Sequence, residues 1–279
     1  MLCEYLNNLT TSKLLDDIID FRKLTPKTTS RNIMKAKLSK IIPMSFIAHE
    51  EITQSVFCRV RKNMSGKFDK VSDFWNPPID KTKLNRLNKV NEPLLYLCLD
   101  PVTPFHESKV EIGDDFTLMY YKYSSKNIIN ARLLEGLPTE RYDNLKEAGL
   151  TESGLNNYKI MADFIKTELI RDVGVGTEYL YDISNILRDY FDPDNQEQAY
   201  LYSSVKNYSR RNLALKPNIA KKLLICTGGH YGKLSSYSMN DESVTFYLLG
   251  SCNNVIYSDA NIKFDDRGGS STVTVKMNN

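Results

Sequence analysis

The stretch RLNKVNEPLLYLCLDPVTPFHE, residues 86–107, decides how the centre of this chain folds. Its apolar run from Leu94 to Leu99 has the length and composition of a buried strand, and the turn-forming pair Asp100-Pro101 ends that strand. A charged residue lies at each end of the stretch, Arg86 before the strand and Glu107 after the turn. Charges at strand ends are most often ordinary surface residues, so the residues alone leave open whether these two line a site.

The composition is that of an ordinary globular protein, and it excludes several functional classes. The 279 residues are 41% hydrophobic and 25% charged, which is enough to bury a large core. The net charge of +3 is too small to hold a nucleic acid along an extended surface. No apolar stretch approaches the roughly 20 residues that cross a bilayer, and the N-terminus lacks a secretory pattern. Five cysteines without a CxxC pair favour a cytoplasmic protein.

The order of the expected elements predicts an α+β fold around one mixed sheet. Helices and strands are grouped along the chain and do not alternate as in βαβ units. We expect a helical extension over residues 1–50, a central domain over 51–220 and a β-rich part over 221–279 that packs on it. The strands are expected at 55–60, 94–99, 115–123 and 199–203, the main helices at 151–170 and 179–191, and further strands at 223–226, 244–249 and 273–275 with glycine-rich turns between them.

Familiar catalytic motifs are absent from the sequence. The three histidines are far apart and no cysteine pair accompanies them, so a metal site is not expected. The P-loop sequence is missing, Gly174-x-Gly176 has no third glycine, and no Gly-x-Ser-x-Gly occurs. The sequence therefore supports neither a nucleotide cradle of these kinds nor a hydrolase elbow.

Single polar residues near the ends of expected strands suit one type of substrate. Arg59 and Arg86 could hold the oxygens of a pyrophosphate through bidentate guanidinium pairs. Glu107 could stabilise a sugar whose glycosidic bond breaks through an oxocarbenium-like transition state. A serine after the strand at 199–203 could orient a ribose, and Tyr96 could stack on a flat ring.

At these residues the sequence resembles the RES-domain family, which is named for its Arg, Glu and Ser. The family has a Phe/Tyr-x-Arg-x-Arg strand, a Trp/Asn/Pro loop, an Arg-x-Asn element, an apolar strand followed by Asp-x-x-Thr-x-x-x-Glu, a glycine, and Tyr-Pro-Ser before Asn-x-x-Leu/Phe. The corresponding segments, spread over residues 55–216, are Phe57–Arg61, Phe74–Pro78, Arg86-Leu87-Asn88, Leu94–Leu99, Asp100–Glu107, Gly113-Asp114, Tyr202-Ser203-Ser204 and Asn212–Leu215.

Two positions in this match stay open. Ser203 stands where the family has proline, so the family's serine is Ser203 or Ser204, and alignment on Tyr202 favours Ser204. The early strand offers both Arg59 and Arg61, and we prefer Arg59 by its position after Phe57-Cys58. Substrate-binding positions implied by the match are Arg61, Asn88, Tyr96, Tyr202, Ser203 and Asn212, beside catalytic Glu107, Arg59, Arg86 and Ser204.

The resemblance implies an ADP-ribosyltransferase-like fold and the toxin of a toxin–antitoxin pair that depletes NAD. Such enzymes cleave the nicotinamide–ribose bond with inorganic phosphate or water as acceptor. NAD would then be a consumed substrate and not a cofactor, and no metal is implied. An antitoxin protein is the expected partner, with a homodimer as a further possibility. The alternatives are ADP-ribosyl transfer to a macromolecule and a catalytically silent NAD-binding module.

Overall fold

The computed structural model describes residues 2–43, 46, 48–64, 66, 68, 70–137, 141–174, 176–205, 210–238, 242–253 and 264–276. They form two compact units, each assembled from segments that are distant in sequence. The first unit comprises residues 1–50, 82–92 and 131–203, and the second comprises residues 51–81, 93–130 and 204–279. These boundaries differ from the expected division into 1–50, 51–220 and 221–279.

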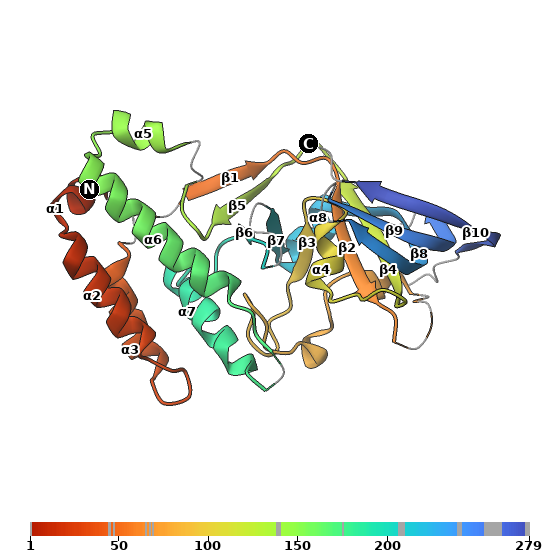
Figure 1. The fold of residues 1–279 in the computed structure, drawn as a ribbon, viewed down its shortest axis with the longest axis horizontal. Coiled ribbons are helices and arrows are strands. Elements are labelled where there is room, and N and C mark those ends of the chain that lie inside the picture. The colour runs from red at the N-terminus through yellow and green to blue at the C-terminus, as the bar shows by residue number, and fades with distance from the viewer. Residues whose placement is uncertain are drawn as a thin grey trace. The chain divides into compact units, whose positions relative to one another are not determined.

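The first unit is mainly helical, and its helices bury one apolar stripe each. In α2 the stripe is Leu14, Ile18 and Phe21, whose spacing places them on one face. The helices α2, α3, α6 and α7 pack against one another (Figure 1). The helices of this unit are α1 (Leu2–Asn8), α2 (Thr11–Arg22), α3 (Arg31–Ile41), α5 (Tyr142–Glu147), α6 (Glu152–Ile170) and α7 (Tyr181–Phe191).

Buried polar contacts explain why the N-terminal helices belong with α6. The Asn157 side chain is fully buried and donates to the carbonyl oxygens of Leu6 and Leu9 at 3.1 and 2.8 Å. Its own carbonyl oxygen accepts from the Thr11 hydroxyl at 2.8 Å. Because a buried amide left without partners is costly, these bonds hold α1 and the start of α2 on α6.

The strands of the chain confirm the α+β class and include both kinds of pairing. In the first unit, β5 (Ile129–Leu133) pairs with β6 (Ala199–Ser203) in parallel. The second unit is antiparallel throughout its described registers, in the order β7-β3-β2-β4-β8-β9-β10. Its strands are β2 (Phe57–Lys62), β3 (Leu95–Cys98), β4 (Asp115–Tyr123), β7 (Arg211–Leu215), β8 (Leu224–Ser238), β9 (Ser243–Asn253) and β10 (Asp265–Lys276), and β1 spans Ala48–Ile52.

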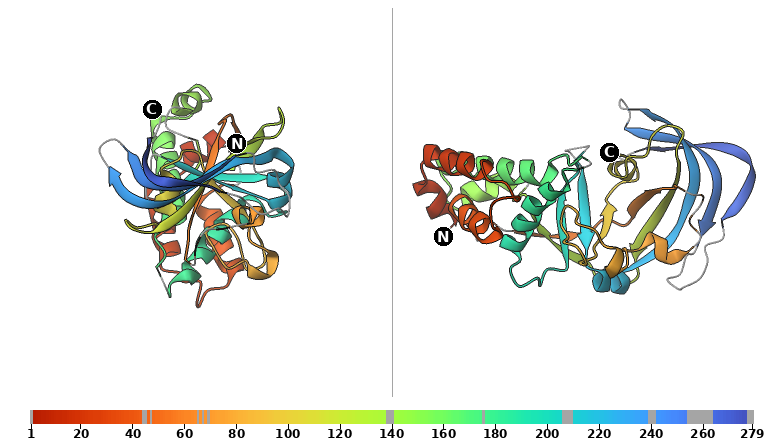
Figure 2. Two further views of the ribbon diagram at one scale, coloured as in Figure 1. Left: turned by 90° about the vertical axis from the view of Figure 1, so that its right-hand side faces the viewer. Right: turned by 90° about the horizontal axis from the view of Figure 1, so that it is seen from below.

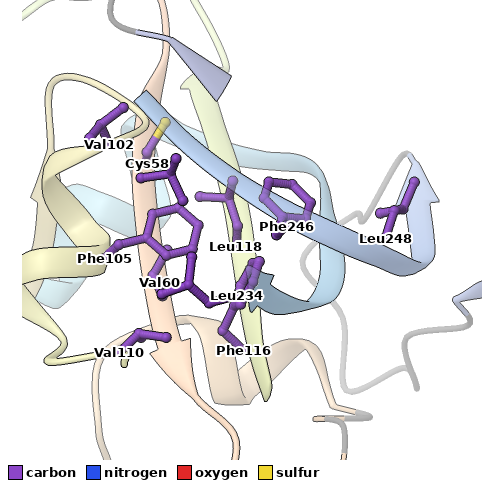
Figure 3. Close-up of a cluster of buried hydrophobic side chains, with 11 residues drawn as sticks. Cys58, Val60, Val102, Phe105, Val110, Phe116, Leu118, Leu234, Phe246 and Leu248 are labelled. Carbon is purple, nitrogen blue, oxygen red and sulfur yellow. The ribbon is translucent and has the colours of Figure 1, made fainter. Parts of the chain in front are cut away.

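A short helix, α4 (Thr103–Glu107), packs on one face of the second unit's sheet. Its Phe105 is fully buried in a cluster with Cys58 and Val60 of β2 and with Phe116 of β4. Figure 3 shows the Phe105 ring lying against the strand that carries Cys58 and Val60. The same helix ends at Glu107, so this apolar contact fixes where the carboxylate begins. The unit also contains the helix α8 (Pro217–Leu223).

The glycine pair Gly228-Gly229 lies inside β8 and does not form the turn expected there. The structure shows one strand from Leu224 to Ser238, which curves beside β4 and β9 (Figure 2). A Cβ atom at Gly229 would lie 2.3 Å from the Leu118 carbonyl oxygen of β4. Glycine is therefore needed at this position because the neighbouring backbone approaches so closely.

Several expected elements agree with the structure to within a few residues. The strands at 115–123 and 199–203 and the helix at 152–170 lie where the apolar patterns predict them. The strands β1 and β5 and the helix α4 were not expected. Among the residues that the structure describes, no helix combines the length and apolar character that a transmembrane span requires.

We expect Phe105→Ala to destabilise the protein by about 3–5 kcal/mol, because truncating a buried phenylalanine leaves a cavity. Urea unfolding followed by the fluorescence of Trp75, the only tryptophan, measures this free energy. Ile112→Ala is the matched control, since Ile112 is 66% exposed, and it should change stability by less than about 0.5 kcal/mol. Equal losses in both variants would contradict the packing described for α4.

Candidate active site

The carboxylate of Glu107 is held in the second unit by three hydrogen bonds to one of its oxygens. Oε1 accepts from the Ser204 hydroxyl at 2.6 Å, from the Asn212 side-chain amide at 2.8 Å and from the Val205 backbone N–H at 3.1 Å. Ser204 and Asn212 are buried, while Glu107 is half-buried. Three donors on one oxygen fix the orientation of the carboxylate, because hydrogen bonds to an ionised acceptor are strong.

The second oxygen of the same carboxylate, Oε2, accepts no hydrogen bond from any residue within the described ranges. Glu107 therefore has one oxygen saturated by the protein and one that remains able to accept a hydrogen bond or to face a positive charge. Such an arrangement keeps a carboxylate in place while it presents charge to a bound molecule.

Local hydrogen bonds place the helix that carries Glu107. Asp100 Oδ1 accepts from the backbone N–H groups of Val102 and Thr103 at 2.9 and 2.8 Å, and so stabilises the turn that leads into α4. At the other end, the Ser108 hydroxyl donates to the Val60 carbonyl oxygen of β2 at 2.7 Å. These contacts explain why the Asp-x-x-Thr-x-x-x-Glu spacing produces a short helix whose last residue lies over the sheet.

The neighbouring thiol completes the hydrogen bonding of Asn212. Asn212 lies directly opposite Cys98 in the pairing of β7 with β3, and its Oδ1 accepts from the Cys98 Sγ–H at 3.2 Å. Burial, and then the charge of Glu107, raises the pKa of the Cys98 thiol well above its usual value. The thiol therefore stays protonated and can donate, which leaves the amide nitrogen of Asn212 free to donate to Glu107.

The alternation of side chains along each strand determines which of them point to the face of the sheet on which α4 and Glu107 lie. Cys98 lies opposite both Asn212 and Cys58, so these three side chains point to one face of the sheet. Cys58 packs against α4 in the buried cluster, which identifies this face as the one that α4 covers. Arg59 follows Cys58 in β2 and therefore points to the opposite face.

Arg59 and Arg61 bind backbone carbonyl groups on that opposite face. Arg59 donates to the carbonyl oxygens of Trp75 and Phe74 at 2.6 and 3.3 Å, and Arg61 donates to that of Asp73. Burial lowers the pKa of both guanidinium groups. The expectation that Arg59 faces the same substrate as Glu107 is thus corrected, because the alternation of β2 turns Arg59 toward the 3-10 helix η2 (Val71–Phe74).

Arg86 and Asn88 lie in the first unit, in a segment bound to its helices. The Arg86 guanidinium donates to the carbonyl oxygens of Leu169 and Arg171 at the end of α6 and lies over the Tyr181 ring at 5.5 Å. Asn88 donates to two carbonyl oxygens of its own loop. A cation at a helix C-terminus is stabilising, so these contacts give Arg86 a structural role within this unit.

The two adjacent serines of the predicted motif have different carboxylate partners. Ser204 donates to Glu107, whereas Ser203 donates to Glu135 through both its hydroxyl, at 2.6 Å, and its backbone N–H. Tyr202 lies in β6 of the first unit and is buried. Tyr96 lies two residues before Cys98 in β3 and opposite Ala214 of β7, so alternation places it on the same face of the sheet as Cys98 and Asn212.

The structure thus brings Glu107, Ser204 and Asn212 together from positions about 100 residues apart. Of the other predicted residues, Arg59 and Arg61 lie on the opposite face of the sheet, Tyr96 lies two residues before Cys98 in β3, and Arg86, Asn88, Tyr202 and Ser203 belong to the first unit. Sequence reasoning missed the backbone N–H of Val205, for which no side-chain pattern gives a signal.

No protein-family model matches this chain, and no curated protein matches it.

We expect Asn212→Asp to destabilise the protein in a pH-dependent way. The substitution places a second carboxylate within hydrogen-bond distance of Glu107, so the pKa of one of the two acids is raised in the folded state. A raised pKa gives a contribution that is present at low pH and lost as the pH rises through it. The loss relative to wild type should therefore be small near pH 4 and grow toward pH 7, by about 1.4 kcal/mol for every pH unit that separates the folded from the unfolded pKa.

Urea unfolding at several pH values measures this difference. Asn127→Asp is the control, because Asn127 is exposed in the same unit and a new charge there is solvated. A pH-independent loss in Asn212→Asp would show that the side chain at position 212 does not lie against the Glu107 carboxylate.

We expect Arg59→Met to cost about 1–3 kcal/mol of stability, because the carbonyl oxygens of Phe74 and Trp75 lose their donor. The emission of Trp75 should shift in the folded variant, since this residue lies at the lost contact. Urea unfolding and the emission spectrum test the structural role. A fully stable variant with an unchanged spectrum would show that Arg59 does not hold this loop.

Proposed function

We propose that this protein cleaves the nicotinamide–ribose bond of NAD, with Glu107 stabilising the ribosyl cation that develops as the bond breaks. The acceptor is inorganic phosphate or water, so the products are nicotinamide and ADP-ribose or its phosphate ester. The observation that carries this proposal is the meeting of Glu107, Ser204 and Asn212 at one carboxylate oxygen. These residues are three of those that the RES-domain pattern singles out, and Glu107 is about 100 residues from the other two in sequence.

The geometry of the carboxylate suits this chemistry. A glycosidic bond that breaks heterolytically leaves positive charge on the ribose ring, and a fixed carboxylate lowers the energy of that state. Ser204, Asn212 and Val205 hold Oε1, while Oε2 has no partner among the described residues. In this proposal Ser204 is a positioning residue that orients Glu107, a role that differs from the expected contact with the ribose.

One rival function is a catalytically silent NAD-binding module, which the departure of Ser203 from the family's proline favours. Both β2 arginines donate through Nη1 to backbone carbonyl oxygens, which gives each of them a structural role whichever function holds. This alternative predicts a saturable rise in melting temperature with NAD and no release of nicotinamide. An antitoxin partner, a homodimer and an ADP-ribosyltransferase-like fold stay predictions of the family resemblance.

We expect the purified protein to release nicotinamide from NAD, and Glu107→Gln to reduce the rate at least about 100-fold. Glutamine is isosteric and its Oε1 can still accept the three hydrogen bonds, so the variant removes the charge with little change in shape. Chromatography of the products, with and without phosphate, measures the rate and identifies the acceptor. Melting curves establish that Glu107→Gln remains folded.

Glu51→Gln is the control for a non-specific loss of charge, because Glu51 is an exposed acid of the same unit and its variant should retain full activity. NAD labelled in the adenosine part separates degradation from transfer, since transfer leaves the label on a macromolecule. If the wild-type protein releases no nicotinamide with phosphate or with water, NAD cleavage is ruled out.

A further inference from the structure

A surface pocket of about 370 Å³ lies beside the C-terminal end of α4, within the second unit. It is lined by His106, Lys109, Val110, Glu111 and Tyr237. His106 immediately precedes Glu107, so the pocket begins one residue from the carboxylate that the proposed function uses. Neither the sequence patterns nor the proposed chemistry assigns a role to these side chains.

One wall of the pocket is a stacked pair of flat rings. The centroids of His106 and Tyr237 are 4.7 Å apart, with 25° between the ring planes. The Tyr237 hydroxyl donates to the Val110 carbonyl oxygen at 2.5 Å, which fixes the ring, and both rings are half-buried. A fixed aromatic pair at a pocket is a platform on which a third flat ring, such as a nucleobase, can stack.

Lys109 occupies a backbone position that normally takes glycine. After α4, the N–H of Val110 donates to the carbonyl of Phe105, and the N–H of Lys109 donates to that of His106. This pair of bonds is the Schellman arrangement, which requires a left-handed residue where Lys109 has φ of 51°. A lysine is strained there, and strain held at a pocket points to a function for the side chain.

The Lys109 ammonium is also available to a ligand. Lys109 is exposed, and within the described part of the chain it takes part in no side-chain hydrogen bond or ion pair. The other lysines near this end of the sheet are engaged, since Lys62 pairs with Asp114 and Lys233 with Asp115. Lys109 is therefore the cation at this pocket that can bind an anion without first breaking an ion pair.

We propose that this pocket binds a nucleoside phosphate, with the base stacked on His106 and Tyr237 and the phosphate paired with Lys109. Glu111, the exposed acid of the pocket, accepts hydrogen bonds from the ribose hydroxyls, as acidic side chains do in other nucleotide sites. The inference rests on the proposed function, in which it names the part of the site that holds the adenosine phosphate half of NAD.

The pocket and the Glu107 carboxylate lie on either side of the end of α4, since His106 stacks on Tyr237 of β8 and Glu107 contacts Asn212 of β7. Lys109 follows Glu107 by two residues, so their Cα atoms are at most roughly 8 Å apart. A dinucleotide extends over a longer distance than this, so its phosphates can reach Lys109 while one ribose lies at Glu107. Lys109 then supplies a phosphate contact on the face of the sheet that α4 covers, which is not the face on which Arg59 and Arg61 lie.

The test compares ADP, adenosine and inorganic pyrophosphate as probes in titration calorimetry at low salt, with the Glu107→Gln protein to exclude turnover. We expect ADP to bind more tightly than either part alone. His106→Ala should weaken ADP and adenosine roughly tenfold and leave pyrophosphate unchanged. Lys109→Gly should weaken ADP and pyrophosphate roughly tenfold, whereas Lys109→Arg should stay within about threefold of the parent.

Lys109→Gly also separates binding from folding. Glycine relieves the left-handed strain, so this variant should melt no lower than its parent although it binds ADP less well. Lys126→Gly is the control, because Lys126 is an exposed lysine elsewhere in the unit, and it should bind ADP normally. Absence of saturable ADP binding, or equal ADP affinity in Lys109→Gly and its parent, overturns the pocket.

The outcomes distinguish this inference from the proposed function. NAD cleavage without ADP binding at the pocket would overturn the inference and leave the cleavage intact. ADP binding that depends on Lys109 and His106, in a protein that releases no nicotinamide, would support the pocket and rule out the proposed reaction.

Discussion

The contact of Glu107 Oε1 with Ser204, Val205 and Asn212 is the constraint on which the candidate site depends. It joins the end of α4 to the start of β7 and to the segment before it, across about 100 residues of sequence. A half-buried carboxylate is costly unless its charge is met by donors, and here one oxygen receives all three. The bonds therefore position a charge and also tie α4 to β7 and to the segment before it.

Two further contacts hold the residues around the Glu107 carboxylate in place: the apolar packing of Phe105 and the hydrogen bond of the Cys98 thiol. Phe105 anchors α4 on the sheet, and the protonated Cys98 holds the carbonyl end of Asn212. The orientation of the Asn212 amide follows from these two partners, since its oxygen faces the thiol and its nitrogen faces the carboxylate. A cysteine that looks like a simple core residue in sequence thus decides which end of a neighbouring amide meets the charge.

The sequence predicted the strands with the clearest apolar runs and missed those whose cues were local. Residues 115–123 and 199–203 are strands in the structure because their side chains are buried almost continuously. The five-residue α4 depends on the turn that Asp100 stabilises before it and on the burial of Phe105, and neither produces a periodic pattern long enough to recognise. β8 runs through Gly228-Gly229 because β4 and β9 approach closely there, a condition that only the folded neighbours create.

For the candidate site, too, the sequence predicted some features and missed others. Spacing and family resemblance singled out Glu107, Ser204 and Asn212, and the structure brings these three together. Alternation along β2 implies that Cys58 and Arg59 face opposite ways, but the sequence cannot say which face α4 covers. Arg59 was therefore expected beside Glu107 and lies instead over the carbonyl groups of η2 and the residue after it.

The hydrogen bonds of the two neighbouring serines constrain the length of β6. Ser203 is bound to Glu135 and Ser204 to Glu107, and the chain passes from the first unit to the second between them. A one-residue deletion in this strand would turn the side chains on one side of it to the opposite face, so that at least one of the two serines would lose its carboxylate partner. Variation in related chains should therefore accumulate before or after this strand, while the number of residues within it stays constant.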